Sequence, residues 1–253
     1  MTSKERRFLF GTDYPCVVLA GGMGTRMQPS VPNVPKSLIP VRGRPFIEWQ
    51  LEWLVAQGVR DVILGIGHLG GDIRRHVGNG ESFGLQAAYV DEGDSLKGTA
   101  GALRLAVDEL GIATPFYVLY GDSLLDVSIA DVTSTYQEVG LPALMTVFRN
   151  ERRWEESNAV FDGRLVTRYE KRLATPPSDM VYVDYGFLII DSPVIDEFVP
   201  AGEVADLADV LGRLSTSGRL AGFEASRRFF EIGSPEGLVA LEEYLATKRD
   251  QSQ

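Results

Sequence analysis

The chain has 253 residues, 44% of them hydrophobic, which supplies the core of one large α/β domain or two small ones. Its 35 acidic residues outnumber 25 lysines and arginines, and the formal charge of −10 argues against general binding to nucleic acid or to an anionic membrane. No apolar run reaches the roughly 20 residues that span a bilayer, and no convincing signal peptide precedes the first strand, which predicts a soluble cytoplasmic protein.

The first part of the chain alternates strand-like and helical segments. Short apolar runs predict strands over residues 16–20, 61–67, 85–90 and 115–122. Apolar residues at helical spacing predict helices over 45–57 and 99–110, the second capped by Thr99. This order implies parallel strands joined by right-handed crossovers. We expect an α/β fold, a Rossmann-like three-layer αβα sandwich with a mostly parallel twisted sheet, and a site at the carboxyl ends of the strands.

After Pro142 the predicted strands become shorter. Asp162 and Gly163 form a hairpin-turn signal between two of these strands. The predicted strands cover 143–148, 158–163, 164–171, 181–190 and 228–234, and the predicted helices cover 203–215 and 235–248. No repeat or linker separates the halves, so we expect one domain over residues 1–253. The change of pattern near residue 142 divides this domain into a first half of about 14–142 and a second half of about 143–253.

A glycine-rich, basic loop follows the first predicted strand. No acidic residue occurs over 14–47, although this stretch contains Arg26, Lys36, Arg42 and Arg44. Its glycines, Gly21, Gly22 and Gly24, let successive backbone N–H groups approach phosphate oxygens. The guanidinium of Arg26 is suited to phosphate, and Lys36 lies between prolines ten residues later. A carboxylate here would compete with phosphate for these cations, so the pattern predicts a phosphate site.

A tight turn with solvated basic side chains is the simplest alternative for this loop, and an isolated GGxG segment is more often such a turn than a ligand site. The loop has neither the G-x-x-x-x-G-K-[ST] spacing of a P-loop nor the G-x-G-x-x-G spacing of a dinucleotide-binding turn. The added Arg26, Lys36 and local charge asymmetry favour a different kind of phosphate cradle.

The segment "LAGGMGTRMQPSVPNVPKSLIPVRGRPFIEW" resembles the opening signature of the sugar-1-phosphate nucleotidylyltransferases, GGxGTRxxP…PKxLxPVxxxP. The resemblance implies a fold of the nucleotide-diphospho-sugar transferase type, closest in look to short heptose or mannose-1-phosphate guanylyltransferases. It implies that Arg26 and Lys36 are catalytic and contact the triphosphate. The residues that it implies for nucleotide binding are Leu19, Ala20, Gly21, Gly22, Gly24 and Thr25.

A second candidate nucleotide contact is the segment "KGTAGALRLAV". Free backbone N–H groups at a strand–helix junction would let a base or ribose lie against Gly98, Thr99 and Ala100. An ordinary helix N-terminus has the same pattern. The family has a similar G-T-x-x-A segment that contacts nucleotide, here preceded by the insertion-like "GDSLK".

"YVLYGDSLLD" ends a buried strand in Gly121 and Asp122, which places a carboxylate at the carboxyl edge of the sheet. Mg²⁺ prefers oxygen ligands and bridges a carboxylate to phosphates. An aspartate that caps a turn is the alternative. The resemblance implies that Asp122 is catalytic and binds Mg²⁺, and that Gly121 lies beside the sugar phosphate.

The resemblance also implies a sugar-phosphate pocket in the second half. Glu170 and Lys171 stand at the family's E-K-P, with Arg172 in place of the proline, and Lys171 would meet the phosphate. Without the family match a solvated charge pair is the simpler interpretation. Asn158, Tyr185 and Gly186 fall where the family shapes its sugar pocket.

"RFFEIGSPEGL" resembles the family's W-x-D-x-G-T-P-E-D-L, with Glu231 in place of a metal-binding aspartate. Glutamate is one methylene longer, and Mg²⁺ demands near-octahedral geometry. Direct binding, binding through water and no binding all stay open for Glu231.

These features together predict an enzyme that joins a nucleoside triphosphate to a sugar 1-phosphate and releases pyrophosphate, with Mg²⁺ as cofactor. GTP with heptose or mannose 1-phosphate is the preferred pair, and CTP, UTP or dTTP are the alternatives. Two other classes remain open: a metal-dependent glycosyltransferase, and a nucleotide-sugar-binding regulatory subunit. The sequence is compatible with a homo-oligomer.

Overall fold

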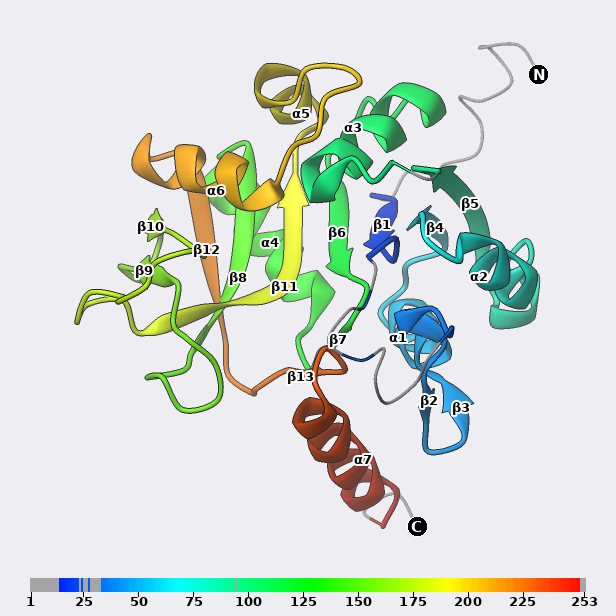
Figure 1. Ribbon diagram of the computed structural model, residues 1–253. Helices are drawn as coiled ribbons and strands as arrows, with labels where there is room; N and C mark the ends of the chain where they lie inside the picture. The colour runs from blue at the N-terminus through cyan, green and yellow to red at the C-terminus, as the bar shows by residue number, and fades with distance from the viewer. Residues whose placement is uncertain (1–13, 23, 25–26, 28–32, 94, 251–253) are drawn as a thin grey trace.

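The parallel part of the central sheet is built by the first four long strands. The computed structural model describes residues 14–22, 24, 27, 33–93 and 95–250 (Figure 1). In space the strands follow the order β5-β4-β1-β6, and all neighbouring pairs among them are parallel. The strands are β1 (Cys16–Leu19), β4 (Asp61–Ile66), β5 (Gln86–Asp91) and β6 (Phe116–Tyr120). The predicted parallel sheet is confirmed, and its carboxyl ends lie at one edge.

Strands of the second half continue the same sheet. The long strand β11 (Tyr182–Ile190) runs antiparallel to β6 and to β8 (Ala143–Arg149), and β12 (Leu220–Ala225) pairs parallel with β8. The hairpin of β9 (Ala159–Phe161) and β10 (Val166–Tyr169) joins the first residue of β11, which completes a nine-stranded sheet.

The hairpin turn predicted at Asp162–Gly163 is confirmed. Asp162 N–H donates to the Leu165 carbonyl, its carboxylate accepts the N–H groups of Arg164 and Leu165, and Gly163 has a φ of 99°. These backbone hydrogen bonds lower the pKa of Asp162, the bond from Leu165 most strongly. The turn connects β9 to β10 and thereby joins the segments that carry Asn158 and Lys171.

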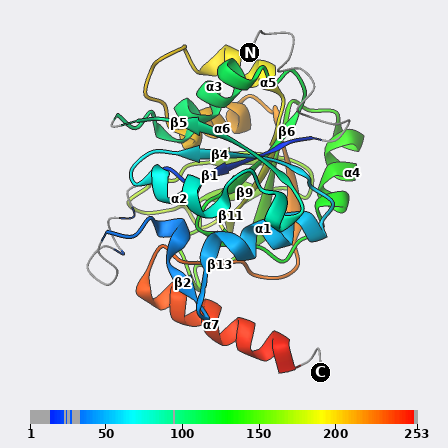
Figure 2. The same cartoon turned by 90° about the vertical axis from the view of Figure 1, so that its right-hand side faces the viewer.

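Helices cover both faces of the sheet, as the αβα prediction requires (Figure 2). Successive residues of a strand point to opposite faces, so Val17, Ile63 and Val118 enter one core while Val18, Leu64 and Leu119 enter the other. The first core is closed by α3 (Gly98–Leu110), α5 (Ser192–Phe198) and α6 (Leu207–Thr216). The second is closed by α1 (Phe46–Ala56), α2 (Gly70–Val77) and α4 (Ile129–Val139).

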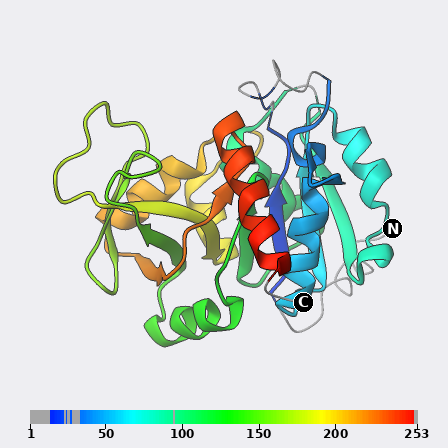
Figure 3. The ribbon, with the colours of Figure 1, turned by 90° about the horizontal axis from the view of Figure 1, so that it is seen from below.

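A third, smaller core joins the end of the chain to the beginning (Figure 3). Here α7 (Pro235–Asp250) packs on two short hairpin-like pairs, and the rings of Phe230 and Tyr244 stack with centroids 4.2 Å apart. The pairs are β2 (Pro40–Val41) with β3 (Arg44–Pro45), and β7 (Ser123–Leu124) with β13 (Phe230–Glu231). The short 3-10 turns are η2 (Lys36–Leu38) and η3 (Glu81–Phe83). Within the described residues, no helix is both long and apolar enough to cross a bilayer.

Candidate active site

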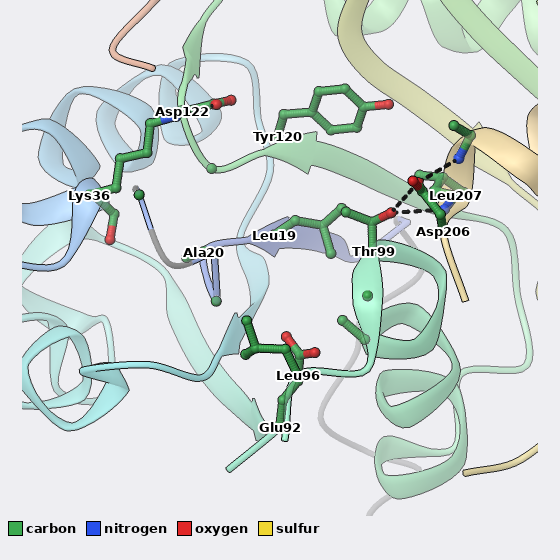
Figure 4. A pocket seen from close by; sticks show the side chains of 18 of the residues that line it. Leu19, Ala20, Lys36, Glu92, Leu96, Thr99, Tyr120, Asp122, Asp206 and Leu207 are labelled. Carbon is green, nitrogen blue, oxygen red and sulfur yellow. Dashed lines mark hydrogen bonds and ion pairs between the residues drawn. The ribbon is translucent and has the colours of Figure 1, made fainter. Parts of the chain in front are cut away.

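The ends of β1 and β6 form the floor of a first cavity, of about 280 Å³ (Figure 4). Gly121 N–H donates to the Leu19 carbonyl at 3.1 Å, which ties the two strand ends together. A Cβ on Gly121 would lie 2.3 Å from that carbonyl oxygen, so only glycine allows this approach. Directly after Gly121, Asp122 lines the cavity at the predicted edge of the sheet.

The glycine loop forms the wall above this floor. Gly21, Gly22 and Gly24 all line the cavity, as do Leu19 and Ala20. Gly24 has a φ of 59°, and a Cβ on Gly21 would lie 2.6 Å from an Oε1 of Glu92, so side chains at these positions would close the space. Thr25 and Arg26 lie outside the described residues, so their predicted roles rest on the sequence.

Lys36 and Asp122, 86 residues apart, meet in this cavity. Lys36 begins η2, just after Pro35, and its Nζ donates to Asp122 Oδ2 at 2.6 Å. Only 16% of the lysine side chain and 33% of the aspartate side chain are exposed, so the pair is shielded from bulk water. Beside it, the buried Ser37 hydroxyl has no hydrogen-bond partner in the described part of the chain. The structure thus brings a cation and an anion, both predicted from sequence, to one point.

The opposite wall comes from the start of α3, and here the expectation of free backbone N–H groups is corrected. The N–H groups of Ala100 and Gly101 both donate to the Ala205 carbonyl, and Ala100 is buried behind the wall. Gly98 and Thr99 do line the cavity. Thr99 is not the helix cap, because that position is taken by Lys97.

The hydroxyl of Thr99 is engaged by the segment before α6. It accepts the N–H of Leu207 at 2.8 Å and donates to Asp206 at 3.1 Å (Figure 4). Asp206 and Leu207 therefore complete the cavity from a segment that the sequence did not single out.

Glu92 is a further acidic group in the first cavity that sequence reasoning did not single out. It follows β5, and its Oε2 accepts the N–H of Lys97 at 2.6 Å. Burial is the largest influence on its carboxyl and raises the pKa, while the hydrogen bond from Lys97 acts in the opposite direction. Because the Lys97 bond uses Oε2, Oε1 is the oxygen next to Gly21 and the cavity. The sequence signal that could have identified Glu92 was the presence of acidic residues shortly before a helix that begins with glycine.

A second cavity of about 580 Å³ adjoins the first and shares Tyr120, Asp122 and Lys171 with it. Lys171 follows β10, and its Nζ lies 5.6 Å from the centroid of the Tyr120 ring. Asn158, predicted from sequence to lie beside the sugar, and Glu231, the candidate metal ligand, both line this second cavity. Lys171 therefore stands at the junction of the two cavities, beside Asp122.

A buried carboxylate that the sequence did not single out organises this junction. Asp184 is 7% exposed, and its Oδ2 accepts the hydroxyls of Tyr120 at 2.6 Å and Tyr169 at 3.1 Å. Its own N–H donates to Asn158 Oδ1 at 2.9 Å. Burial first, and then the Asp184 charge, raise the pKa of both tyrosines, so both remain donors. The network fixes the Tyr120 ring beneath Lys171.

Three residues predicted to surround the sugar lie elsewhere. Tyr185 is fully buried in the core on the other face of the sheet, where its hydroxyl accepts the N–H of Asp126. Gly186, with a φ of 91°, lies inside β11 against Ser123, and lines neither cavity. Glu170 is exposed and borders a shallow hollow beside α6. Within β11, Val183 and Asp184 provide the lining of the second cavity instead.

The residues present fit a magnesium ion that is completed by substrate. Asp122 directly precedes β7 and Glu231 ends the partner strand β13, and Ile232 N–H donates to the Asp122 carbonyl at 3.0 Å. Both residues line the second cavity. Glu231 accepts the Ser234 hydroxyl at 2.6 Å and the Gly233 N–H, so both its oxygens are engaged. No cluster of three or more acidic, histidine or cysteine ligands occurs among the residues with described positions. One or two carboxylates plus substrate phosphates are the usual magnesium ligands.

A protein-family model described as Nucleotidyl transferase matches residues 16–162. The chain belongs to this family. It is 28% identical over 217 residues to the UTP–glucose-1-phosphate uridylyltransferase of Synechocystis, covering 80% of this chain and 55% of that protein. It is 29% identical over 236 residues to the mannose-1-phosphate guanylyltransferase of Mycobacterium tuberculosis, covering 88% and 62%.

The chain thus spans a little over half the length of these two relatives. The solved structure of HddC from Yersinia pseudotuberculosis shares the fold of this nucleotidyl transferase chain, with a TM-score of 0.76. Its sequence is 20% identical, and the match covers 92% of this chain and 100% of that one. The likeness confirms the predicted nucleotide-diphospho-sugar transferase fold.

Proposed function

We propose that this chain is a sugar-1-phosphate nucleotidylyltransferase, which converts a nucleoside triphosphate and a sugar 1-phosphate to a nucleotide sugar and pyrophosphate. The observation that carries the proposal is the pair of cavities that meet at Tyr120, Asp122 and Lys171. A reaction between two substrates needs two sites with one shared point, where the reacting atoms are held together. The glycine loop borders only the first cavity, which suits the triphosphate, and leaves the second for the sugar phosphate.

The two halves of the chain supply the two sites unequally. Most lining of the first cavity comes from residues 14–142, with Lys171 and residues 206–208 added from the second half. Most lining of the second cavity comes from residues 143–253. This supports our division into a nucleotide-binding and a sugar-phosphate-binding half.

In the proposed mechanism the phosphate oxygen of the sugar 1-phosphate attacks the α-phosphorus in line, and the bond from that phosphorus to the departing pyrophosphate breaks. No nucleophile from the protein is required, so catalysis rests on positioning and charge stabilisation. Lys171 holds the attacking phosphate from the second cavity, and Lys36 binds the triphosphate from the first. From its sequence position, Arg26 stabilises the charge on pyrophosphate.

Asp122, with Glu231 beside it, would hold Mg²⁺. A bound magnesium ion would neutralise charge on the substrate phosphates. Asp122 would then hold the metal in place of Lys36, and the lysine ammonium would be available for a substrate phosphate. Glu231 is held by its own loop, so we assign Asp122 as the principal ligand.

Glu92 supports our preference for GTP. An ionised carboxylate only accepts hydrogen bonds. The Watson–Crick edge of guanine presents adjacent N1–H and N2–H donors, whereas the edges of uracil and thymine present one N–H between two carbonyls. A carboxylate in the first cavity therefore favours guanine and repels the carbonyls of uracil and thymine. The sugar is proposed as heptose or mannose, from the resemblance of the "YGDSLLD" and "EIGSPEGL" segments.

The test is a matrix of reactions with Mg²⁺, in which GTP, CTP, UTP, dTTP and ATP are each paired with hexose and heptose 1-phosphates. Pyrophosphate release and the nucleotide-sugar product are measured, and Asp122→Asn is the negative control with nearly unchanged volume. Release with GTP and a heptose or mannose 1-phosphate, lost in the variant, is the expected result. Nucleotide binding without release for any pair would refute an enzymatic role and favour the regulatory subunit. Glu92→Gln should shift the preference from GTP toward UTP, because an amide both donates and accepts.

A further inference from the structure

The second cavity contains a cation that the proposed reaction does not use. Arg228 precedes β13 and lines the cavity together with Lys171, and these are its two basic lining residues in the described part of the chain. Since Lys171 is assigned to the phosphate of the sugar 1-phosphate, the proposed reaction assigns no substrate group to Arg228. Its surroundings indicate what it can bind.

The guanidinium of Arg228 is held by aromatic rings. Its Cζ lies 4.9 Å from the ring centroid of Trp154 and 4.6 Å from that of Phe230. Its Nε donates to the Phe229 carbonyl at 3.3 Å. Ring contacts and this backbone bond fix the plane of the guanidinium, and a fixed planar fork binds an anion with less entropy loss than a free one.

No carboxylate within the described residues forms an ion pair with Arg228, whereas its neighbour Arg227 pairs with Asp126 at 3.0 Å. Burial is the largest influence on Arg228 and lowers its pKa, and the nearby Glu155 raises it. Glu155 and two other exposed carboxylates, Glu156 and Glu236, also border the cavity, in positions open to solvent screening. A part-buried cation without an ion-pair partner gains most from an anionic ligand.

We propose that Arg228 binds a second acidic group of the sugar substrate, distinct from the phosphate at C1. The inference rests on the proposed function and narrows its substrate class to hexose or heptose 1-phosphates that also carry a carboxylate or a second phosphate. Such a substrate spans the cavity with an anion at each cation: the reacting phosphate at Lys171 and the other acidic group at Arg228. Trp154, whose side chain is 49% exposed at this cavity, provides an aromatic surface against the sugar ring beside it.

The experiment compares three substrates with GTP: mannose 1-phosphate, mannuronic acid 1-phosphate and mannose 1,6-bisphosphate. We expect kcat/KM to be at least about tenfold higher for one or both acidic sugars than for mannose 1-phosphate, since a charge-assisted pair is being formed. An advantage confined to the uronic acid identifies a carboxylate, and one confined to the bisphosphate identifies a phosphate. Equal kcat/KM for all three overturns the inference.

Three variants separate a binding role from a structural one. Arg228→Gln should abolish the advantage of the acidic sugar, Arg228→Lys should retain part of it, and the matched neighbour Arg227→Gln should leave it intact. An advantage that survives in Arg228→Gln overturns the inference. If none of the three sugars is turned over, the proposed function fails. Calorimetric measurement of the binding of the same three sugars then decides whether Arg228 binds an acidic group. Tighter binding of an acidic sugar, lost in Arg228→Gln, supports the inference, and equal binding overturns it.

Discussion

Replacing Gly121 by alanine, which adds one methyl group, should disturb the contact between the ends of β1 and β6 that supports both cavities. The Cβ of an alanine would lie 2.3 Å from the carbonyl oxygen of Leu19, 2.8 Å from its carbonyl carbon and 2.9 Å from the Cα of Ala20. All three atoms belong to the backbone, and Leu19 is the last residue of the central strand β1. Neither strand end can move aside by a side-chain rotation, so β1 and β6 must separate.

The cost follows from these distances. Overpacking a core with one methyl group costs about 1–3 kcal/mol, and we place Gly121→Ala at about 2–3 kcal/mol because the clash is with backbone. For a chain of this size that corresponds to a melting temperature lower by roughly 4–12 °C. The hydrogen bond from Gly121 N–H to Leu19, at 3.1 Å, should lengthen in the variant.

The matched control is Gly71→Ala. Gly71 lies in α2 and is exposed, and a Cβ added there would have no atom within 4 Å, so alanine should stabilise the helix by about 0.5–1 kcal/mol. Urea unfolding and calorimetry of both variants should thus give effects of opposite sign. A Gly121→Ala protein whose unfolding free energy lies within about 0.5 kcal/mol of the wild type, the range of a typical surface substitution, would refute the argument.

Three further predictions concern side chains around the junction. Burial raises the pKa of Glu92 above its unfolded value, so the stabilising contribution of this carboxyl is present at acid pH and is lost as the pH rises through the folded pKa. Glu92→Gln should therefore raise the melting temperature at pH 7 and not at pH 4. Equal shifts of the melting temperature at both pH values would contradict this. Tyr169→Phe removes a donor to Asp184 and should cost about 1.5–3 kcal/mol in urea unfolding. The raised pKa of Tyr169 should also make wild-type stability fall above a pH of about 10, with a shallower fall in the variant; parallel pH curves would speak against it. Tyr120→Leu removes the ring under Lys171 and should raise the KM for sugar 1-phosphate about two- to fivefold. Tyr120→Phe keeps the ring and should raise this KM less. Identical KM values for the two variants would exclude a role of the cation–π contact in substrate binding.

The sheet was predictable from sequence to the extent that each strand carried its own pattern. The runs at 16–20, 61–67 and 115–122 are mostly apolar because both faces of those strands are buried, and all three strands are confirmed. The elements that were missed include α4 (Ile129–Val139), α5 (Ser192–Phe198) and β12 (Leu220–Ala225). The short run of β12 is interrupted by Gly222, and its pairing with β8 is a tertiary contact that no local pattern records.

The residues of the candidate site likewise divide into those that a local sequence pattern reveals and those that it does not. Lys36, Asp122 and Lys171 could be found because each follows a recognisable local motif, and the structure brings all three together. Asp184 could not, because its importance comes from hydroxyls of two tyrosines 64 and 15 residues away. The misplacement of Tyr185 has a related cause: the motif alone did not fix which residues of β11 border the cavity, and these are Val183 and Asp184, earlier in the strand.

The ion pair of Lys36 with Asp122 leaves neither charge without a counter-ion. A divalent cation arriving alone at Asp122 would have to displace the ammonium, and Lys36 would then be left part-buried and uncompensated. A nucleotide arriving alone would draw Lys36 away and leave the carboxylate facing phosphates. A nucleotide that carries its own cation satisfies both residues in one exchange of partners. In the proposed reaction, the pair would therefore favour binding of the complete cation–nucleotide complex over binding of either component alone.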